Sequence, residues 1–163
     1  MKYSAYYVEE IDGVFSASIS ELELKKPSDG FVQIQVSCSS LNYKDALSAS
    51  GNKGVTRNYP FVPGIDAAGT ISDANSSNFV EGDEVLVTGY DMGMNTPGGF
   101  GEFINVPANW VVKKPSALTS TEAMSIGTAG LTAAASVLKI QESSQESDLP
   151  VLVSGATGGV GSI

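Results

Sequence analysis

The sequence predicts a mainly β domain, a small barrel or sandwich, followed by helices and by the first strand of an α/β unit. Three observations support this fold class. Short β-prone stretches with turn residues between them fill residues 1–115. A proline-free segment rich in Ala, Leu, Met and Thr follows at 117–140. A continuous apolar run and a glycine cluster then occupy residues 149–163.

The first 115 residues predict a series of short strands. Asp12-Gly13, a dipeptide typical of tight hairpin turns, lies between the β-prone stretches 2–10 and 15–22. Residues 30–40 alternate in polarity, which predicts a half-buried strand with Val32, Ile34, Val36 and Cys38 on one face and Gln33, Gln35 and Ser37 on the other. Further strands are expected at 69–74, at 82–89 and twice within 98–115.

The segment after Pro115 predicts helices. Thr119 and Glu122 have the spacing of a capping box, in which each side chain satisfies a backbone N–H of the other residue. Gly127 and Gly130 are expected to interrupt the helix, which gives a short helix, a glycine break and a longer helix over about 131–140. Residues 141–148 are polar and predict a solvated loop.

The last stretch has the pattern of a phosphate-binding turn. Apolar residues run together through "LPVLVS" at 149–154, as in a central parallel strand covered on both faces. Gly155, Gly158, Gly159 and Gly161 follow, and such glycines let a backbone approach a pyrophosphate. A plain flexible turn is the alternative. Because a parallel strand needs a partner beyond a crossover, we expect this chain to be the N-terminal portion of a longer protein.

Composition excludes several classes of function. The net charge of −9 disfavours nucleic-acid and anionic-membrane partners. With one cysteine and no histidine, the chain lacks the usual ligands of zinc, so no metal site is expected. The N-terminus has no secretion signal and no uninterrupted apolar run of 18 residues occurs, which predicts a cytoplasmic protein without a membrane partner.

A second polar cluster, Asn42-Tyr43-Lys44-Asp45, follows the strand predicted at 30–40. It could grip a polar ligand, or it could be a solvated turn that opens a short helix with Asn42 as its cap. Pro63-Gly64 predicts a turn, and the small residues at 67–69 predict close backbone packing.

Six motifs resemble, in order and spacing, one branch of a known superfamily: "SSLNYKDAL", "YPFVPGIDAAGT", "EGDEVLVTGY", "GGFGEF", "GTAGLTA" and "VLVSGATGGVGSI". They are similar to the zinc-independent quinone oxidoreductases of the medium-chain dehydrogenase/reductases, and most similar to the acryloyl-CoA reductase group. The resemblance implies a GroES-like, partly open β-barrel over 1–115 and the truncated start of an NAD(P)-binding Rossmann domain over 116–163.

The resemblance also implies an activity. It implies reduction by NADPH of an activated C=C bond in an enoyl thioester such as acryloyl-CoA, or in a quinone or enone, by a homodimeric parent enzyme. Ile65-Asp66 stands where zinc-dependent relatives have a His-Glu pair, which agrees with a reaction without metal. The fragment itself would be inactive. The alternative is a non-catalytic GroES-like module for binding or structure.

Site residues follow from the same resemblance. It implies that Asn42 and Tyr43 lie near the nicotinamide and its ribose, with Tyr43 as the catalytic proton donor or enolate stabiliser. Thr128 would face the nicotinamide. An ion pair between Lys44 and Asp45 would stiffen the loop, and Cys38 would be a small buried residue. The backbone that binds the pyrophosphate would come from Gly158, Gly159, Val160 and Gly161.

Overall fold

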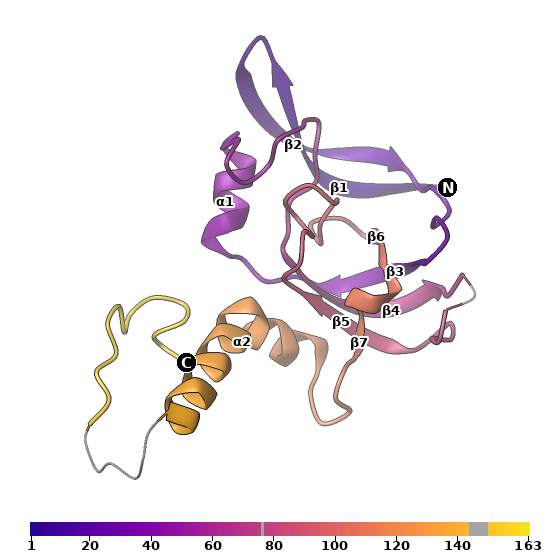
Figure 1. Ribbon diagram of the computed structural model, residues 1–163. Helices are drawn as coiled ribbons and strands as arrows, with labels where there is room; N and C mark the ends of the chain where they lie inside the picture. Colours follow the sequence, from indigo (N-terminus) through magenta and orange to yellow (C-terminus); the bar gives the residue numbers. More distant parts are fainter. Residues whose placement is uncertain (76, 144–149) are drawn as a thin grey trace.

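The computed structural model describes residues 1–75, 77–143 and 150–163, which form two antiparallel sheets, a short helix and a long kinked helix (Figure 1). In chain order the elements are β1 (Lys2–Ile11), β2 (Val14–Glu23), β3 (Phe31–Cys38), α1 (Tyr43–Ala49), β4 (Asp66–Asp73), β5 (Glu84–Thr88), β6 (Phe103–Pro107), the 3-10 turn η1 (Ala108–Trp110), β7 (Val112–Lys113) and α2 (Ser120–Ser143).

The predicted hairpin is confirmed as the pair β1 and β2, which rises from the top of the molecule in Figure 1. Asp12 and Gly13 form its turn with φ of 52° and 77°, values that Asp tolerates and that Gly adopts freely. The hairpin joins the rest of the fold through backbone pairing of Val8 with Phe61 and of Ala5 with Gly101. Ala5 and Val8 are buried there.

A five-stranded sheet in the order β6-β3-β4-β5-β7 carries the core. The sheet does not close on itself, since β6 and β7 are its two edges, and the predicted partly open barrel is thus confirmed. In β3, Val32 and Ile34 are buried while Gln35 is exposed, as the alternation predicts. Gln33 is the exception, since it is buried although polar. Its side-chain amide donates to Lys25 O and Asn105 Oδ1, which satisfies the buried group.

The small residues at the start of β4 pack closely, as predicted. Ala67 and Ala68 of β4 are both buried, and a Cβ on Gly69 would lie 2.0 Å from the carbonyl oxygen of Gln35. Only glycine therefore allows β3 and β4 to approach this closely at that position.

Helix α2 begins with the predicted capping box. Glu122 N–H donates to Thr119 Oγ1 at 3.2 Å, and Thr119 N–H donates to Glu122 Oε2 at 2.8 Å. The two bonds satisfy two of the N–H groups that a helix start leaves unpaired. Donation from the backbone N–H and the hydroxyl of Thr119 lowers the pKa of the Glu122 carboxyl.

The predicted glycine break occurs at Gly127 alone and is a kink in one long helix. Gly127 has φ 46° and ψ −153°, which divides α2, whereas Gly130 is helical and buried. The predicted break at Gly130 is therefore wrong, because a buried helical glycine costs only about 1 kcal/mol relative to alanine. The helix continues through Ser143 into the predicted loop, and residues 144–149 lie outside the described residues.

By length and composition α2 could also cross a membrane, with a mean hydropathy of 1.3 over its most apolar window. The helix contacts β3, β4 and β5, and Ala123 and Met124 in its first half are buried. The second half exposes Leu131, Val137 and Leu138.

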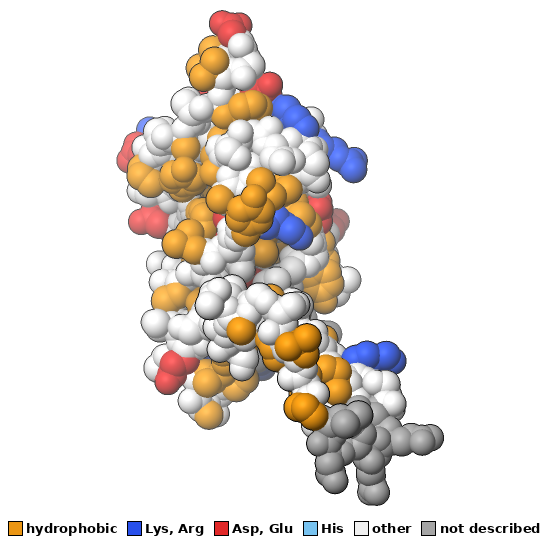
Figure 2. Space-filling model, turned by 90° about the vertical axis from the view of Figure 1, so that its left-hand side faces the viewer, with side chains coloured by type: hydrophobic (Ala, Val, Ile, Leu, Met, Phe, Trp, Pro, Cys, Tyr) orange, Lys and Arg blue, Asp and Glu red, His pale blue; other side chains and the backbone are white. Residues whose placement is uncertain are grey.

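The predicted strand at 150–154 is wrong for the described structure. Val151, Leu152 and Val153 form no ladder, and Leu152 is 93% exposed. A strand needs a hydrogen-bonding neighbour, and no described strand lies beside this segment. After this segment the chain turns back toward α2 (Figure 1). Figure 2, which views the left-hand side of Figure 1, shows separate groups of apolar side chains.

The kink at Gly127 gives a testable prediction. Gly127→Ala should lower the free energy of unfolding by about 2–3 kcal/mol, because the backbone conformation disfavours a side chain and the new Cβ would lie 2.7 Å from Asp66 Oδ2. Gly82→Ala is the matched control: its φ is also positive, at 92°, but a Cβ there meets nothing within 4 Å. Urea unfolding of both variants compares the two costs, and equal losses would contradict the predicted clash.

Candidate functional site

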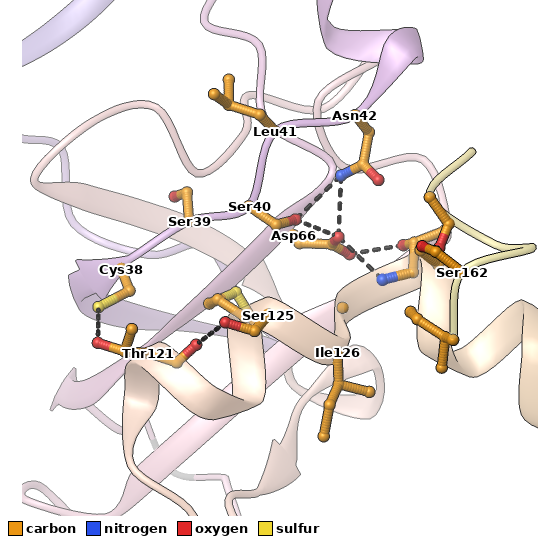
Figure 3. Close-up of a pocket in the computed structure, with 16 residues that line it drawn as sticks. Cys38, Ser39, Ser40, Leu41, Asn42, Asp66, Thr121, Ser125, Ile126 and Ser162 are labelled. Carbon is orange, nitrogen blue, oxygen red and sulfur yellow. Dashed lines mark hydrogen bonds between the residues drawn. The ribbon is translucent and has the colours of Figure 1, made fainter. Parts of the chain in front are cut away.

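A cavity of about 640 Å³ lies between the β domain, α2 and the C-terminal segment (Figure 3). Apolar residues line it together with serine, threonine and asparagine side chains, and we call it the polar cavity after the latter. Its walls come from the end of β3 and the loop after it (residues 38–42), from Asp66 at the start of β4, and from α2 on both sides of the kink. Gly159, Ser162 and Ile163 complete the lining. Segments far apart in the sequence therefore meet at one site.

The carboxylate of Asp66 lies at the centre of this junction and is fully buried. Its Oδ2 accepts from Ser40 Oγ at 2.5 Å and from Asn42 Nδ2 at 3.0 Å, both in the loop after β3. From α2, Thr128 N–H donates to Oδ2 at 2.9 Å and Thr128 Oγ1 donates to Oδ1 at 2.5 Å. Donors from two other segments thus satisfy the buried charge, as burial requires.

The kink explains why Thr128 can reach Asp66. Because Gly127 breaks the regular helix, Thr128 begins its second half, where backbone N–H groups have no partner within the helix. The Asp66 carboxylate accepts that N–H, and its negative charge is favourable at a helix N-terminus. Gly127 also leaves the space that the carboxylate occupies.

Asn42 combines the two roles that the sequence left open. It immediately precedes α1, so it is the N-cap residue, and its side chain also lines the cavity. The amide nitrogen donates to Ser40 Oγ at 2.9 Å and to Asp66. The loop is therefore both a helix start and a wall of the polar cavity.

Asp45 holds this loop against β4. Its buried carboxylate accepts from Asn42 N–H at 2.7 Å and from Ile65 N–H at 2.9 Å. Desolvation by burial is the main cause that raises the pKa of Asp45, although the two backbone hydrogen bonds oppose it. The predicted ion pair with Lys44 is wrong, because no such pair occurs among the described residues and backbone N–H groups occupy the carboxylate instead.

Of the remaining predicted site residues, some line the cavity and others do not. Thr128 and Gly159 line the cavity, whereas Tyr43 is 81% exposed and does not line it. Cys38 lines the cavity and is half-buried rather than buried, with its Sγ 3.7 Å from Thr121 Oγ1. Three of the predicted backbone positions lie outside the lining: Gly158, Val160 and Gly161.

The glycine turn is compact. Gly158 N–H donates to the carbonyl of Gly155 at 2.9 Å, and Ser162 N–H donates to the carbonyl of Gly158 at 3.0 Å. A Cβ on Gly161 would lie 2.4 Å from the Gly155 carbonyl oxygen, so the turn closes only with glycine there. Gly159 lies against α2, since its Cβ would be 3.7 Å from that of Ala129.

The hydroxyl and amide groups of the lining suit a neutral polar ligand group. The lining is rich in serine and threonine hydroxyls and includes the Asn42 amide, and no described Lys or Arg lines it. These groups match the hydroxyls and amide of a nicotinamide nucleoside, and the glycine turn offers backbone to a phosphate. Among the described residues no group of three His, Cys, Asp or Glu side chains could hold a metal ion.

Sequence reasoning missed the importance of Asp66 and Ser40. It treated Asp66 only as a replacement for a metal-binding pair. A signal was present, since Asp66 is a lone charge within the small and apolar run "PGIDAAGTI". A carboxylate in such a run is buried with its strand and must find hydrogen-bond donors.

Comparison with known proteins adds a family. A model of the alcohol dehydrogenase GroES-like domain matches residues 28–116. YhfP of Bacillus subtilis (strain 168), named among the quinone oxidoreductases, is 46% identical over 84% of this chain and 42% of its own length. AcuI of Escherichia coli (strain K12), named a probable acrylyl-CoA reductase, is 42% identical over 97% of this chain and 49% of its own length.

A solved structure agrees with this pattern. The Salmonella enterica yhdH oxidoreductase in complex with NADP has a TM-score of 0.91 and 42% identity, over 98% of this chain and 49% of that one. This chain thus spans about half the length of the relatives it matches.

The Asp45 contacts predict a pH-dependent loss of stability. Asp45→Asn should lower the free energy of unfolding by about 1–3 kcal/mol, because an NH₂ group cannot accept the N–H of Asn42 or Ile65. Burial raises the pKa of Asp45, so the stability from its neutral form is present below about pH 4 and is lost as pH rises through the raised pKa.

The difference between wild type and Asp45→Asn should therefore grow as pH falls from 7 toward 4. Chemical unfolding at several pH values measures it. Asp12→Asn, at the exposed hairpin turn, is the control and should change stability little at any of these pH values. A difference that stays constant with pH would show that Asp45 does not titrate as its burial requires.

Proposed function

Because this chain belongs to the alcohol dehydrogenase GroES-like domain family, we propose that the protein containing it reduces an activated carbon–carbon double bond with NADPH. The substrate class is an enoyl thioester such as acryloyl-CoA, or a quinone or enone. The names of the relatives, a probable acrylyl-CoA reductase and a quinone oxidoreductase, support this class.

One observation carries the proposal. Asn42, Thr128 and Gly159, which come from three separate segments of the sequence, line one cavity. A nicotinamide nucleotide needs such an arrangement, since its nucleoside and its pyrophosphate must be held at once. The NADP complex of the Salmonella relative supports the choice of cofactor.

The bound cofactor would supply the hydride. Asn42 and Thr128 would bind the nicotinamide nucleoside through hydrogen bonds, and the turn Gly158–Gly161 would offer its backbone to the pyrophosphate. The exposed phenol of Tyr43 would donate a proton to the α-carbon of the substrate or stabilise the enolate. The side chains thus orient the reactants and manage one proton.

This chemistry fits residues that are poor metal ligands. Ile65 is apolar and buried, and Asp66 has both carboxylate oxygens engaged in hydrogen bonds. A metal ion at this position would have to displace those donors from a buried carboxylate. We therefore propose that hydrogen bonds, not a metal, stabilise the developing enolate.

A second, apolar hollow of about 560 Å³ supports a place for the substrate. It meets the polar cavity at Leu41 and Asn42, and Tyr6 and Phe100 contribute aromatic surface. An acyl chain or a quinone ring could lie there beside the nicotinamide. The homodimer, the cytoplasmic location and the domain boundary between 115 and 116 stay predictions of the sequence.

The proposal predicts an assay result for the protein that contains this chain. Purified protein should bind NADPH and oxidise it in the presence of acryloyl-CoA or a small quinone, followed as loss of NADPH absorbance. Acyl-CoA without the double bond is the control substrate and should give no turnover. Protein that binds no NADPH, and oxidises none with either substrate, would leave the binding or structural module as the better description.

The role of Tyr43 gives a separate prediction. Tyr43→Phe should lower kcat about 100-fold, because a positioned proton donor contributes a factor of that order. Tyr90→Phe is the control: Tyr90 is also exposed, and its ring stacks on Trp110, which the change leaves in place. Steady-state kinetics of both variants tests this role. An unchanged kcat in Tyr43→Phe would show that the Tyr43 hydroxyl takes no part in the reaction.

A further inference from the structure

We infer that Asp66 is a positioning residue that fixes the hydrogen-bonding polarity of the cavity wall. Through Asp66, Asn42 and Thr128 present acceptor oxygens to the cavity. The wall therefore binds ligand groups that donate hydrogen bonds, namely the ribose hydroxyls or the carboxamide of a nicotinamide nucleoside. This inference rests on the proposed function for the identity of the ligand.

Each hydrogen bond to Asp66 has a fixed direction. An ionised carboxylate accepts hydrogen bonds and donates none. Every group that contacts Asp66 must therefore turn a hydrogen toward it. The carboxylate is fully buried, so water cannot replace a misplaced partner at low cost.

Asn42 is the first group whose orientation this determines. Its amide nitrogen contacts Asp66 Oδ2 at 3.0 Å and Ser40 Oγ at 2.9 Å. Because these two oxygens are themselves 2.5 Å apart, one amide hydrogen points between them and is shared. Ser40 in turn donates its own hydrogen to Asp66. The amide nitrogen must therefore face Asp66, and the amide oxygen points away from it (Figure 3).

Thr128 is the second group whose orientation Asp66 determines. Its hydroxyl hydrogen is committed to Asp66 Oδ1 at 2.5 Å, and its backbone N–H to Oδ2 at 2.9 Å. The hydroxyl oxygen keeps its lone pairs but has no hydrogen left to offer a ligand. Thr128 therefore meets the cavity as an acceptor, like the oxygen of Asn42.

This polarity divides the cavity into two regions. A phosphate, which only accepts hydrogen bonds at its ionised oxygens, would meet acceptor oxygens on these side chains and a buried negative charge behind them. Hydroxyl and amide groups would find acceptors already oriented. Phosphate binding is thereby left to the glycine turn around Gly159, where the ligand would meet backbone.

The closing experiment compares two ligands in the whole protein. Asp66→Asn replaces one acceptor oxygen by an NH₂ group, which cannot accept from Thr128 or Asn42 and so disturbs their orientation. The dissociation constant for NADPH should rise about 10–100-fold, as expected for the loss of one or two hydrogen bonds. That for adenosine 2′,5′-bisphosphate, which lacks the nicotinamide nucleoside, should change less than about twofold.

Asp73→Asn is the matched control, since it removes the same charge at the other end of β4, where Asp73 Oδ1 accepts from Asn75 N–H. It should leave both affinities unchanged. If Asp66→Asn folds poorly, Thr128→Val keeps the backbone bond to Asp66 and removes only the hydroxyl, and should weaken NADPH alone. Equal losses for both ligands would reduce Asp66 to a structural tie, and no loss for either would overturn the inference.

Hydrogen exchange of the Asn42 side-chain amide tests the network without any nucleotide. The hydrogen that faces Asp66 and Ser40 should exchange slowly in wild type and much faster in Asp66→Asn. Equal rates in the two proteins would overturn the assigned orientation. Wild-type protein that binds neither nucleotide would overturn the proposed function and the assigned ligand, while the exchange rates would still decide the role of Asp66.

Discussion

The junction between the β domain and α2 depends on a single buried carboxylate, that of Asp66. A charge removed from water costs several kcal/mol unless donors surround it, and Asp66 accepts four hydrogen bonds from the loop after β3 and from α2. Loss of either segment would leave that charge without enough partners. The same bonds that hold α2 against the β domain therefore also shape the wall of the cavity.

Glycine at 127 makes this junction possible for two reasons at once. Its backbone conformation interrupts α2 and frees the N–H of Thr128, and its missing side chain leaves room for the carboxylate. Asp45 has a comparable role nearby, where it ties the start of α1 to the strand that carries Asp66. Two buried acidic residues thus position a cavity whose remaining walls are neutral.

Local features were predictable because they rest on short-range chemistry. The turn at Asp12-Gly13, the alternation in β3 and the capping box of Thr119 with Glu122 all follow from neighbours in sequence. The prediction of a strand at 150–154 was wrong because a strand depends on a long-range partner: it forms only where a second strand lies beside it. The predicted interruption at Gly130 was wrong because its burial in the packed helix outweighs the low helix propensity of glycine.

By itself the sequence determined the β-rich class, the helix that follows it, the glycine turn and the polar residues at 42–45, because periodicity and turn chemistry act over a few residues. Only the tertiary structure decided which polar groups meet. It placed Asn42, Thr128 and Gly159 around one cavity, left Tyr43 outside its lining and buried Asp66 at the junction. Contacts between distant segments depend on the packing of the whole chain, which no local pattern records.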